Sequence, residues 1–127
     1  MQELHFEDAW NRTISDKDKQ LIHATFNQTC ENSIDQIHFS VFRTAVNHKG
    51  EYLIMALIHN FSDVTFTFSN TTVYYVEKEQ VIAKQCFSFP QLMIKEKTSM
   101  PWTFIFQKES FDYDPSFEDP ALTIYLK

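Results

Sequence analysis

The sequence holds a single glycine among its 127 residues and only two cysteines. Loops that cradle phosphate groups need several glycines, so P-loop and dinucleotide-binding motifs are excluded. Cys30 and Cys86 stand far apart and lack the CxxC or His-x-x-Cys neighbours of zinc and redox sites. We therefore expect both to be free thiols buried in the protein, as is common in a reducing compartment.

Clustered positive charge and long apolar runs are also missing. The formal net charge is −6, and acidic and basic residues alternate along the chain. A surface that follows phosphates needs several cations on one face, so we expect neither nucleic acid nor an anionic membrane surface as partner. The longest apolar run, residues 52–58, is much shorter than the ~20 residues that span a bilayer, and residues 1–10 lack the basic start and the apolar stretch that a secretory signal needs. We expect no membrane insertion and a cytoplasmic location.

Aromatic residues, by contrast, are plentiful, at 16% of the chain with thirteen phenylalanines. Aromatic and β-branched residues suit the pleated, half-buried surface of a sheet. A hydrophobic share of 43% in a chain of this length is enough for one core, so we expect a single domain over residues 1–127.

One helix is predicted, over residues 15–28. Ser15 is a good N-cap with Asp18 three residues later, and Leu21, Ile22 and Phe26 fall on one stripe at helical spacing. Bulky apolar groups also precede this segment. We therefore expect residues 1–33 to form a lid that contains the helix and covers one side of a sheet.

After residue 34 the hydrophobic period changes to two, which predicts strands over 37–45, 52–59, 64–68, 73–76, 81–89, 101–106 and 122–126. Pro90 is expected to end a strand, with residues 92–94 as a separate short edge piece. Gly50 marks a turn and the expected site of positive φ. The spacing predicts a mainly β fold, an immunoglobulin-like antiparallel β-sandwich over 34–127 with one N-terminal α-helix.

Catalytic and metal-binding motifs are weak throughout. His59 ends the most apolar strand and is either a base or ligand, or a histidine whose nitrogens satisfy a strand-end turn; the second interpretation is favoured because metal ligands normally cluster. Cys86 and His59 are residue types that can act as nucleophile and base, but no sequence motif supports such a pair. The acids between residues 112 and 119 lack the spacing of a calcium loop. We expect no enzyme activity, no metal and no cofactor.

Three segments taken together resemble a known family. These are His5 with Trp10 and the run of residues 14–19 (ISDKDK), then residues 47–51 (NHKGE) leading into 57–60 (LIHN), and finally residues 98–106 (TSMPWTFIF). In this order they resemble the SLAP domain over about residues 4–125. Two positions depart from the family pattern: Phe6 replaces the proline after the first histidine, and Gln107 replaces a proline after the last phenylalanine.

The resemblance implies an accessory factor, in the cytoplasm or at the inner face of the membrane, in the export or assembly of S-layer and other cell-surface proteins of Bacillus-like Gram-positive bacteria. A protein partner is implied, either the ATPase of an accessory Sec translocase or a surface-protein precursor, and a homodimer is plausible because sandwich edges invite pairing. Binding would use an exposed sheet edge or the aromatic residues, and the candidate binding residues are Phe6, Trp10, His59 and Trp102. The alternative is a sandwich that binds a small molecule or a carbohydrate.

Overall fold

The computed structural model describes residues 2–6, 15–29 and 37–124. Within them lie one α-helix, seven strands and a short 3-10 helix. They are β1 (Glu3–Leu4), α2 (Asp16–Thr29), β2 (Ile37–Val46), β3 (Tyr52–Asn60), β4 (Phe66–Glu77), β5 (Gln80–Ile94), β6 (Thr98–Phe106), η1 (Lys108–Ser110) and β7 (Pro120–Thr123).

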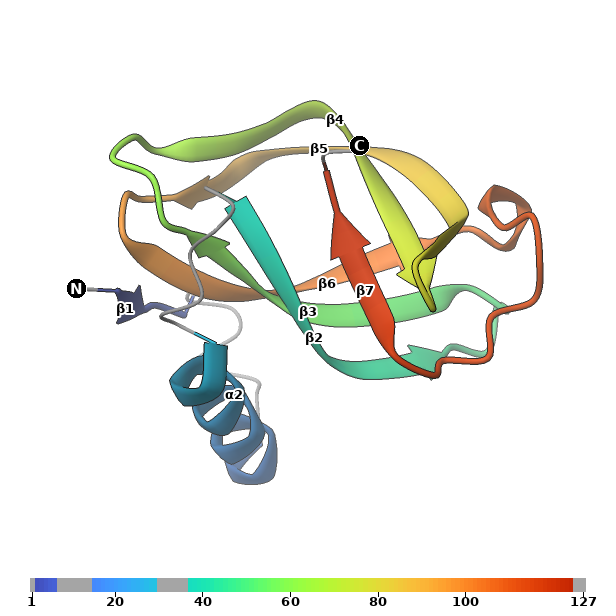
Figure 1. The fold of residues 1–127 in the computed structure, drawn as a ribbon, viewed down its shortest axis with the longest axis horizontal. Coiled ribbons are helices and arrows are strands. Elements are labelled where there is room, and N and C mark those ends of the chain that lie inside the picture. The colour runs from blue at the N-terminus through green and yellow to red at the C-terminus, as the bar shows by residue number, and fades with distance from the viewer. Residues whose placement is uncertain (1, 7–14, 30–36, 125–127) are drawn as a thin grey trace.

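The strands form two sheets that pack face to face (Figure 1). Sheet A has the order β1-β6-β3-β2 and sheet B the order β5-β4-β7. All pairings are antiparallel except that of β1 with β6, which is parallel. The predicted mainly β sandwich with one helix is confirmed.

The space between the sheets is filled largely by aromatic rings. Phe68, Phe104 and Phe106 are almost fully buried, and Phe87 packs edge-on against the last two with ring centroids 5.4 and 5.2 Å away. Edge-to-face pairs of this kind add to the gain from burying their area. The high phenylalanine content of the sequence therefore forms the core.

Helix α2 packs against β2 and β3, and Figure 1 shows it outside the sandwich. Its start is the predicted one, since the Ser15 Oγ accepts a hydrogen bond from the Asp18 N–H at 3.1 Å. Ile22 is fully buried, and Asp18 forms an ion pair of 2.7 Å with Arg43 on β2. The helix thus covers part of the outer face of sheet A.

Two predicted strand breaks are wrong. Strand β4 runs unbroken where two pieces were expected, and β5 continues through Pro90 to Ile94. Register shifts near Phe68 in the β4–β5 pairing absorb the extra residues. Because β5 is the edge strand of sheet B, a proline without an N–H is tolerated there.

The turn predicted at Gly50 is confirmed, with φ at +80°. The Asn47 carboxamide accepts hydrogen bonds from the Lys49 and Glu51 backbone, both at 3.0 Å, which stabilises the turn. Six other described residues, all non-glycine, also have positive φ: Asn70, Lys78, Glu79, Lys97, Phe117 and Asp119. The sequence did not predict these positions, since glycine is the usual marker of such a conformation.

Candidate functional site

Strand β1 lies at the edge of sheet A. The Glu3 N–H donates to the Lys97 carbonyl at 2.9 Å and the His5 N–H donates to the Ser99 carbonyl at 2.8 Å. Backbone groups alternate in direction along a strand, so the N–H and C=O of Leu4 point away from β6. Within the described part of the chain no further strand pairs with this side of β1.

The side chain of Gln2 fastens β1 to the buried interior. Its amide donates to the Asn60 carbonyl at 3.2 Å and to the Ser99 Oγ at 3.0 Å. The Ser99 Oγ lies 2.6 Å from the His59 Nδ1, and the His59 Nε2 lies 3.0 Å from the Ser40 Oγ. A hydrogen-bonded chain therefore runs from β1 through β6 and β3 to β2.

His59 is fully buried within this chain of contacts. Its ring stacks on Phe61 with an interplanar angle of 6° and lies near the ring of His38. Burial, and then the nearby charge of His38, lower the pKa of His59 from 6.5 to about 4. The neutral imidazole lies between Ser40 of β2 and Ser99 of β6 and connects these strands across β3. The structure thus gives His59 a role in linking strands, whereas the sequence predicted that its nitrogens satisfy a turn at the strand end.

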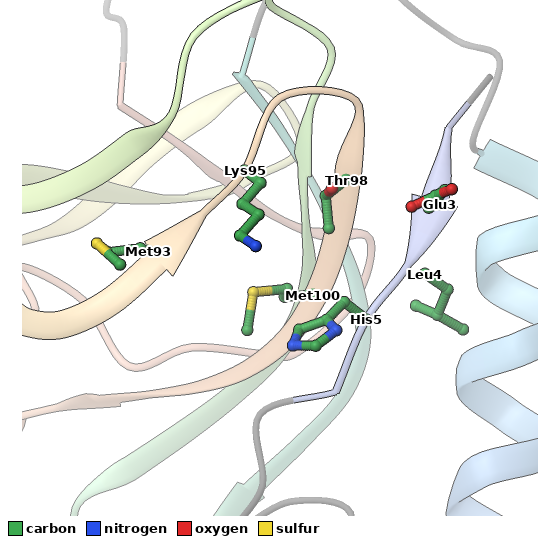
Figure 2. Close-up of a pocket in the computed structure, with 7 residues that line it drawn as sticks. All are labelled: Glu3, Leu4, His5, Met93, Lys95, Thr98 and Met100. Atoms are coloured by element: carbon green, nitrogen blue, oxygen red, sulfur yellow. The ribbon is translucent and has the colours of Figure 1, made fainter.

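A pocket of about 200 Å³ opens beside β1 (Figure 2). Three strands and the residues next to them contribute its lining: Glu3 and Leu4 from β1 with His5 just after it, Met93 at the end of β5 with Lys95 just after it, and Thr98 and Met100 from β6. Figure 2 shows His5 close to Met100, while Leu4 points toward the helix. Thioether side chains adapt to apolar groups of different shapes, and the charged groups at the rim add polar contacts.

The two sheets are joined by side-chain contacts along part of this side of the sandwich, and the pocket lies where these contacts end. Farther along the same side of the sandwich, the Gln85 amide donates to the Ile105 carbonyl at 3.0 Å, and its oxygen accepts from the Gln107 N–H at 2.8 Å. Between this link and the pocket, Trp102 packs on Phe89 with centroids 5.4 Å apart. The hydrogen bonds of Gln85 and the contact of Trp102 with Phe89 fill the rest of this side, so the pocket lies at the end nearest β1.

Of the four predicted binding residues, the three that the structure describes do not form one cluster. Phe6 contacts His23 of α2 with ring centroids 6.0 Å apart, whereas His59 is fully buried between Ser40 and Ser99. Trp102 is half-buried and packs against the core between the sheets. Trp10 lies outside the described residues, so its predicted role stays a prediction.

Cys86 is a free thiol as predicted, but the prediction that it is buried is wrong. Its thiol is free and exposed, because it lies on an edge strand at a position facing away from the core. Cys86 belongs to sheet B, whereas His59 is enclosed by serines of sheet A, so a Cys–His pair is not formed. Cys30 lies outside the described residues.

The described residues contain no group of three His, Cys, Asp or Glu side chains placed to hold a metal ion. None of the helices in that part of the chain is both long and apolar enough to cross a membrane.

Sequence reasoning missed most of the pocket residues. Glu3, Met93 and Lys95 carry no motif, and they meet only because a two-residue strand adds to β6 in parallel. Polar and apolar residues alternate from Glu3 to Phe6, and this pattern of a half-buried strand was the available signal.

Comparison with known proteins gives one match. The family model of the SLAP domain matches residues 4–125, which is nearly the whole chain. Neither the curated proteins nor the solved structures include a significant match.

Proposed function

Because this chain belongs to the SLAP domain family, we propose that it is a non-enzymatic protein-interaction module that assists the export or assembly of S-layer or other cell-surface proteins. Its place of action in this proposal is the cytoplasm, including the inner face of the membrane. The partner is a surface-protein precursor or the ATPase of an accessory Sec translocase.

The observation that carries the proposal is the edge of sheet A at β1. An extended segment of this chain already pairs with β6 there, through the two backbone bonds of Glu3 and His5. Strand addition is a common way to bind an extended polypeptide, because the main-chain bonds are independent of the partner's sequence. The outward backbone groups of Leu4 offer the next position for such a strand.

The adjoining pocket supplies the selectivity that main-chain bonds lack. A strand added beside β1 would direct alternate side chains to the side on which Glu3 and His5 line the pocket. Met93 is 57% exposed at its mouth and Met100 lies within, so an apolar side chain would be accepted. Lys95 is placed to pair with an acidic neighbour of that side chain.

A precursor awaiting export suits this edge, since an unfolded chain offers extended segments with unpaired backbone groups. A folded partner would need to present a free edge strand of its own. The proposal therefore favours the precursor over the ATPase as the chain that contacts β1.

The test is affinity capture of the tagged protein from the lysate of its native host, followed by mass spectrometry. Wild type is compared with Met93→Glu, which places a charge at the pocket mouth, and with Val46→Glu. Val46 is 52% exposed at the opposite end of the sandwich and serves as the matched control.

We expect wild type and Val46→Glu to enrich a surface-protein precursor or the export ATPase, and Met93→Glu to lose it. All three proteins should melt at nearly the same temperature, since both substituted side chains are exposed. Capture of metabolic enzymes alone, or equal enrichment by Met93→Glu, would show that the pocket beside β1 has no role in binding.

A further inference from the structure

A second pocket, of about 240 Å³, lies at the end of the sandwich opposite β1. It is formed by the turn between β4 and β5 and by the loop that precedes β7. The residues that line it are Glu77, Lys78, Gln80, Ile82, Tyr113, Asp114 and Ser116. None of these residues belongs to the site described above.

The wall of this pocket is held in place by the buried carboxylate of Glu77. One oxygen accepts hydrogen bonds from the Tyr75 hydroxyl at 2.6 Å and the Phe117 N–H at 2.7 Å. The other accepts from the N–H and hydroxyl of Ser116, at 3.1 and 3.2 Å. Burial alone would raise the pKa of Glu77, but these four bonds outweigh it and hold the pKa below the ordinary value. An ionised carboxylate thus fixes the loop to the sheet.

Backbone strain is concentrated around the same pocket. Lys78 and Glu79 have φ of 51° and 67°, and Phe117 and Asp119 in the facing loop have φ of 61° and 48°. Non-glycine residues in this conformation cost about 1–2 kcal/mol each, and such strain persists where the surroundings impose it, often at binding sites. Both segments that form the pocket are therefore constrained before any ligand arrives.

The open side of the pocket combines one exposed aromatic ring with polar side chains. Tyr113 is 61% exposed. Among the described residues, no hydrogen bond or ion pair occupies the side chains of Gln80 and Asp114. An aromatic plane offers a surface for C–H groups, while an amide and a carboxylate accept and donate to hydroxyl groups.

From this juxtaposition of an exposed tyrosine, an amide and a carboxylate in a preformed pocket, we propose that this end of the protein binds a saccharide ring. The apolar face of the ring stacks on Tyr113, and its hydroxyls hydrogen-bond to Gln80 and Asp114. Pockets for drug-sized ligands measure about 300–1,000 Å³, so this smaller pocket fits a single sugar unit. The carboxylates of Glu77 and Asp114 disfavour an anionic ligand, since Lys78, the cation in the lining, is already paired with Glu118.

The experiment is an NMR titration of the ¹⁵N-labelled protein with glucose and with N-acetylglucosamine. Glycerol is the control ligand, because it has hydroxyl groups but no ring face. We expect saturable shifts confined to residues 77–82 and 112–117 for a sugar, with a dissociation constant on the order of 1 mM. Glycerol should give none at the same concentration.

Three variants locate the site. Tyr113→Ala should weaken sugar binding by about tenfold or more, and Gln80→Ala by a smaller factor. Val64→Ala, which alters an exposed apolar side chain away from the pocket, should bind like wild type. The proposal is overturned if neither sugar causes saturable shifts, if the shifts lie elsewhere, or if Tyr113→Ala binds as wild type does in a spectrum that shows an intact fold.

Discussion

Two buried ionisable residues each connect parts of the chain that are distant in sequence. His59 lies between Ser40 and Ser99 and reaches β1 through Gln2, whereas Glu77 holds the loop before β7. Both side chains have hydrogen-bond partners for their polar atoms, as buried polar groups require. Their protonation states are opposite in kind, since burial keeps His59 neutral and hydrogen bonds keep Glu77 charged.

The state of His59 makes stability depend on pH. Its pKa is about 4 in the folded protein and 6.5 ordinarily, so the unfolded chain binds the proton more readily. The free energy of unfolding should therefore fall as pH drops from about 6.5 to about 4, by up to about 3 kcal/mol, and then level off with respect to this group. Urea unfolding at a series of pH values measures the slope.

The variant His59→Gln should lose this part of the slope, while His48→Gln, in the exposed turn after β2, should keep it. Carboxylates such as Glu77 contribute to the wild-type curve at the acid end, so the comparison uses the difference between variants. An unchanged slope in His59→Gln would mean that the histidine is not held neutral by the fold.

Glu77 should be costly to replace even by its closest neutral analogue. In Glu77→Gln, one of the two oxygens that accept from Tyr75, Ser116 and Phe117 becomes an amide that cannot accept. Hydrogen bonds to a charged group contribute about 1.5–3 kcal/mol, so we expect a loss of about 2 kcal/mol in urea unfolding. Glu79→Gln, two residues along and exposed, should change stability little. Equal effects of the two variants would contradict the assigned role of Glu77.

At the scale of elements, the turn between β4 and β5 holds non-glycine residues in a backbone conformation that glycine adopts at lower energy. Its two central turn residues, Lys78 and Glu79, both have positive φ, the arrangement in which glycine is preferred at the second position. Glu79→Gly should therefore raise the free energy of unfolding by about 0.5–1 kcal/mol. Thermal and urea unfolding measure the change.

The reverse substitution is available at Gly50, where φ is also positive. An added Cβ would meet nothing within 4 Å, so Gly50→Ala tests the backbone cost without a steric clash. We expect the free energy of unfolding of Gly50→Ala to fall by about 1 kcal/mol.

For the β4–β5 hairpin, a lower free energy of unfolding in Glu79→Gly would contradict the prediction. It would mean that contacts of the glutamate side chain stabilise the exposed turn.

The sequence predicted the elements whose signal is local. The helix begins at its Ser15 cap, the Gly50 turn is present, and β2, β3 and β6 lie close to their expected ranges. The predictions that were wrong, and the strand that was missed, concern features that depend on tertiary contacts. Pro90 does not end β5 because the strand lies at an edge, Cys86 is exposed because its position faces away from the core, and β1 forms only by pairing with the distant strand β6.

The candidate site was predictable only in part. His59 was singled out for being polar at the end of an apolar strand, and the structure gives it a defined position, but its partners come from β2 and β6. The pocket of Figure 2 joins three strands that no local pattern brings together. Glu77 was not among the predicted site residues, because its donors Ser116 and Phe117 lie 39 and 40 residues away in the sequence.

For the whole molecule, the two proposed sites lie at opposite ends of the sandwich. The pocket beside β1 is next to the Asn60 end of β3, and the pocket with Tyr113 is next to the turn that follows Glu77. The rigid aromatic core between them keeps the ends at a fixed separation. Nothing in this arrangement requires one site to be occupied before the other.

Independent sites predict that the two binding activities can be removed separately. Met93→Glu should abolish capture of the export partner and leave the affinity for the sugar unchanged, and Tyr113→Ala should do the opposite. Each variant is measured in both assays, together with the double variant, which should lose both activities without a further fall in melting temperature. If Tyr113→Ala also abolished partner capture, the partner would have to reach both ends of the sandwich, and the export partner itself would then be expected to carry the saccharide.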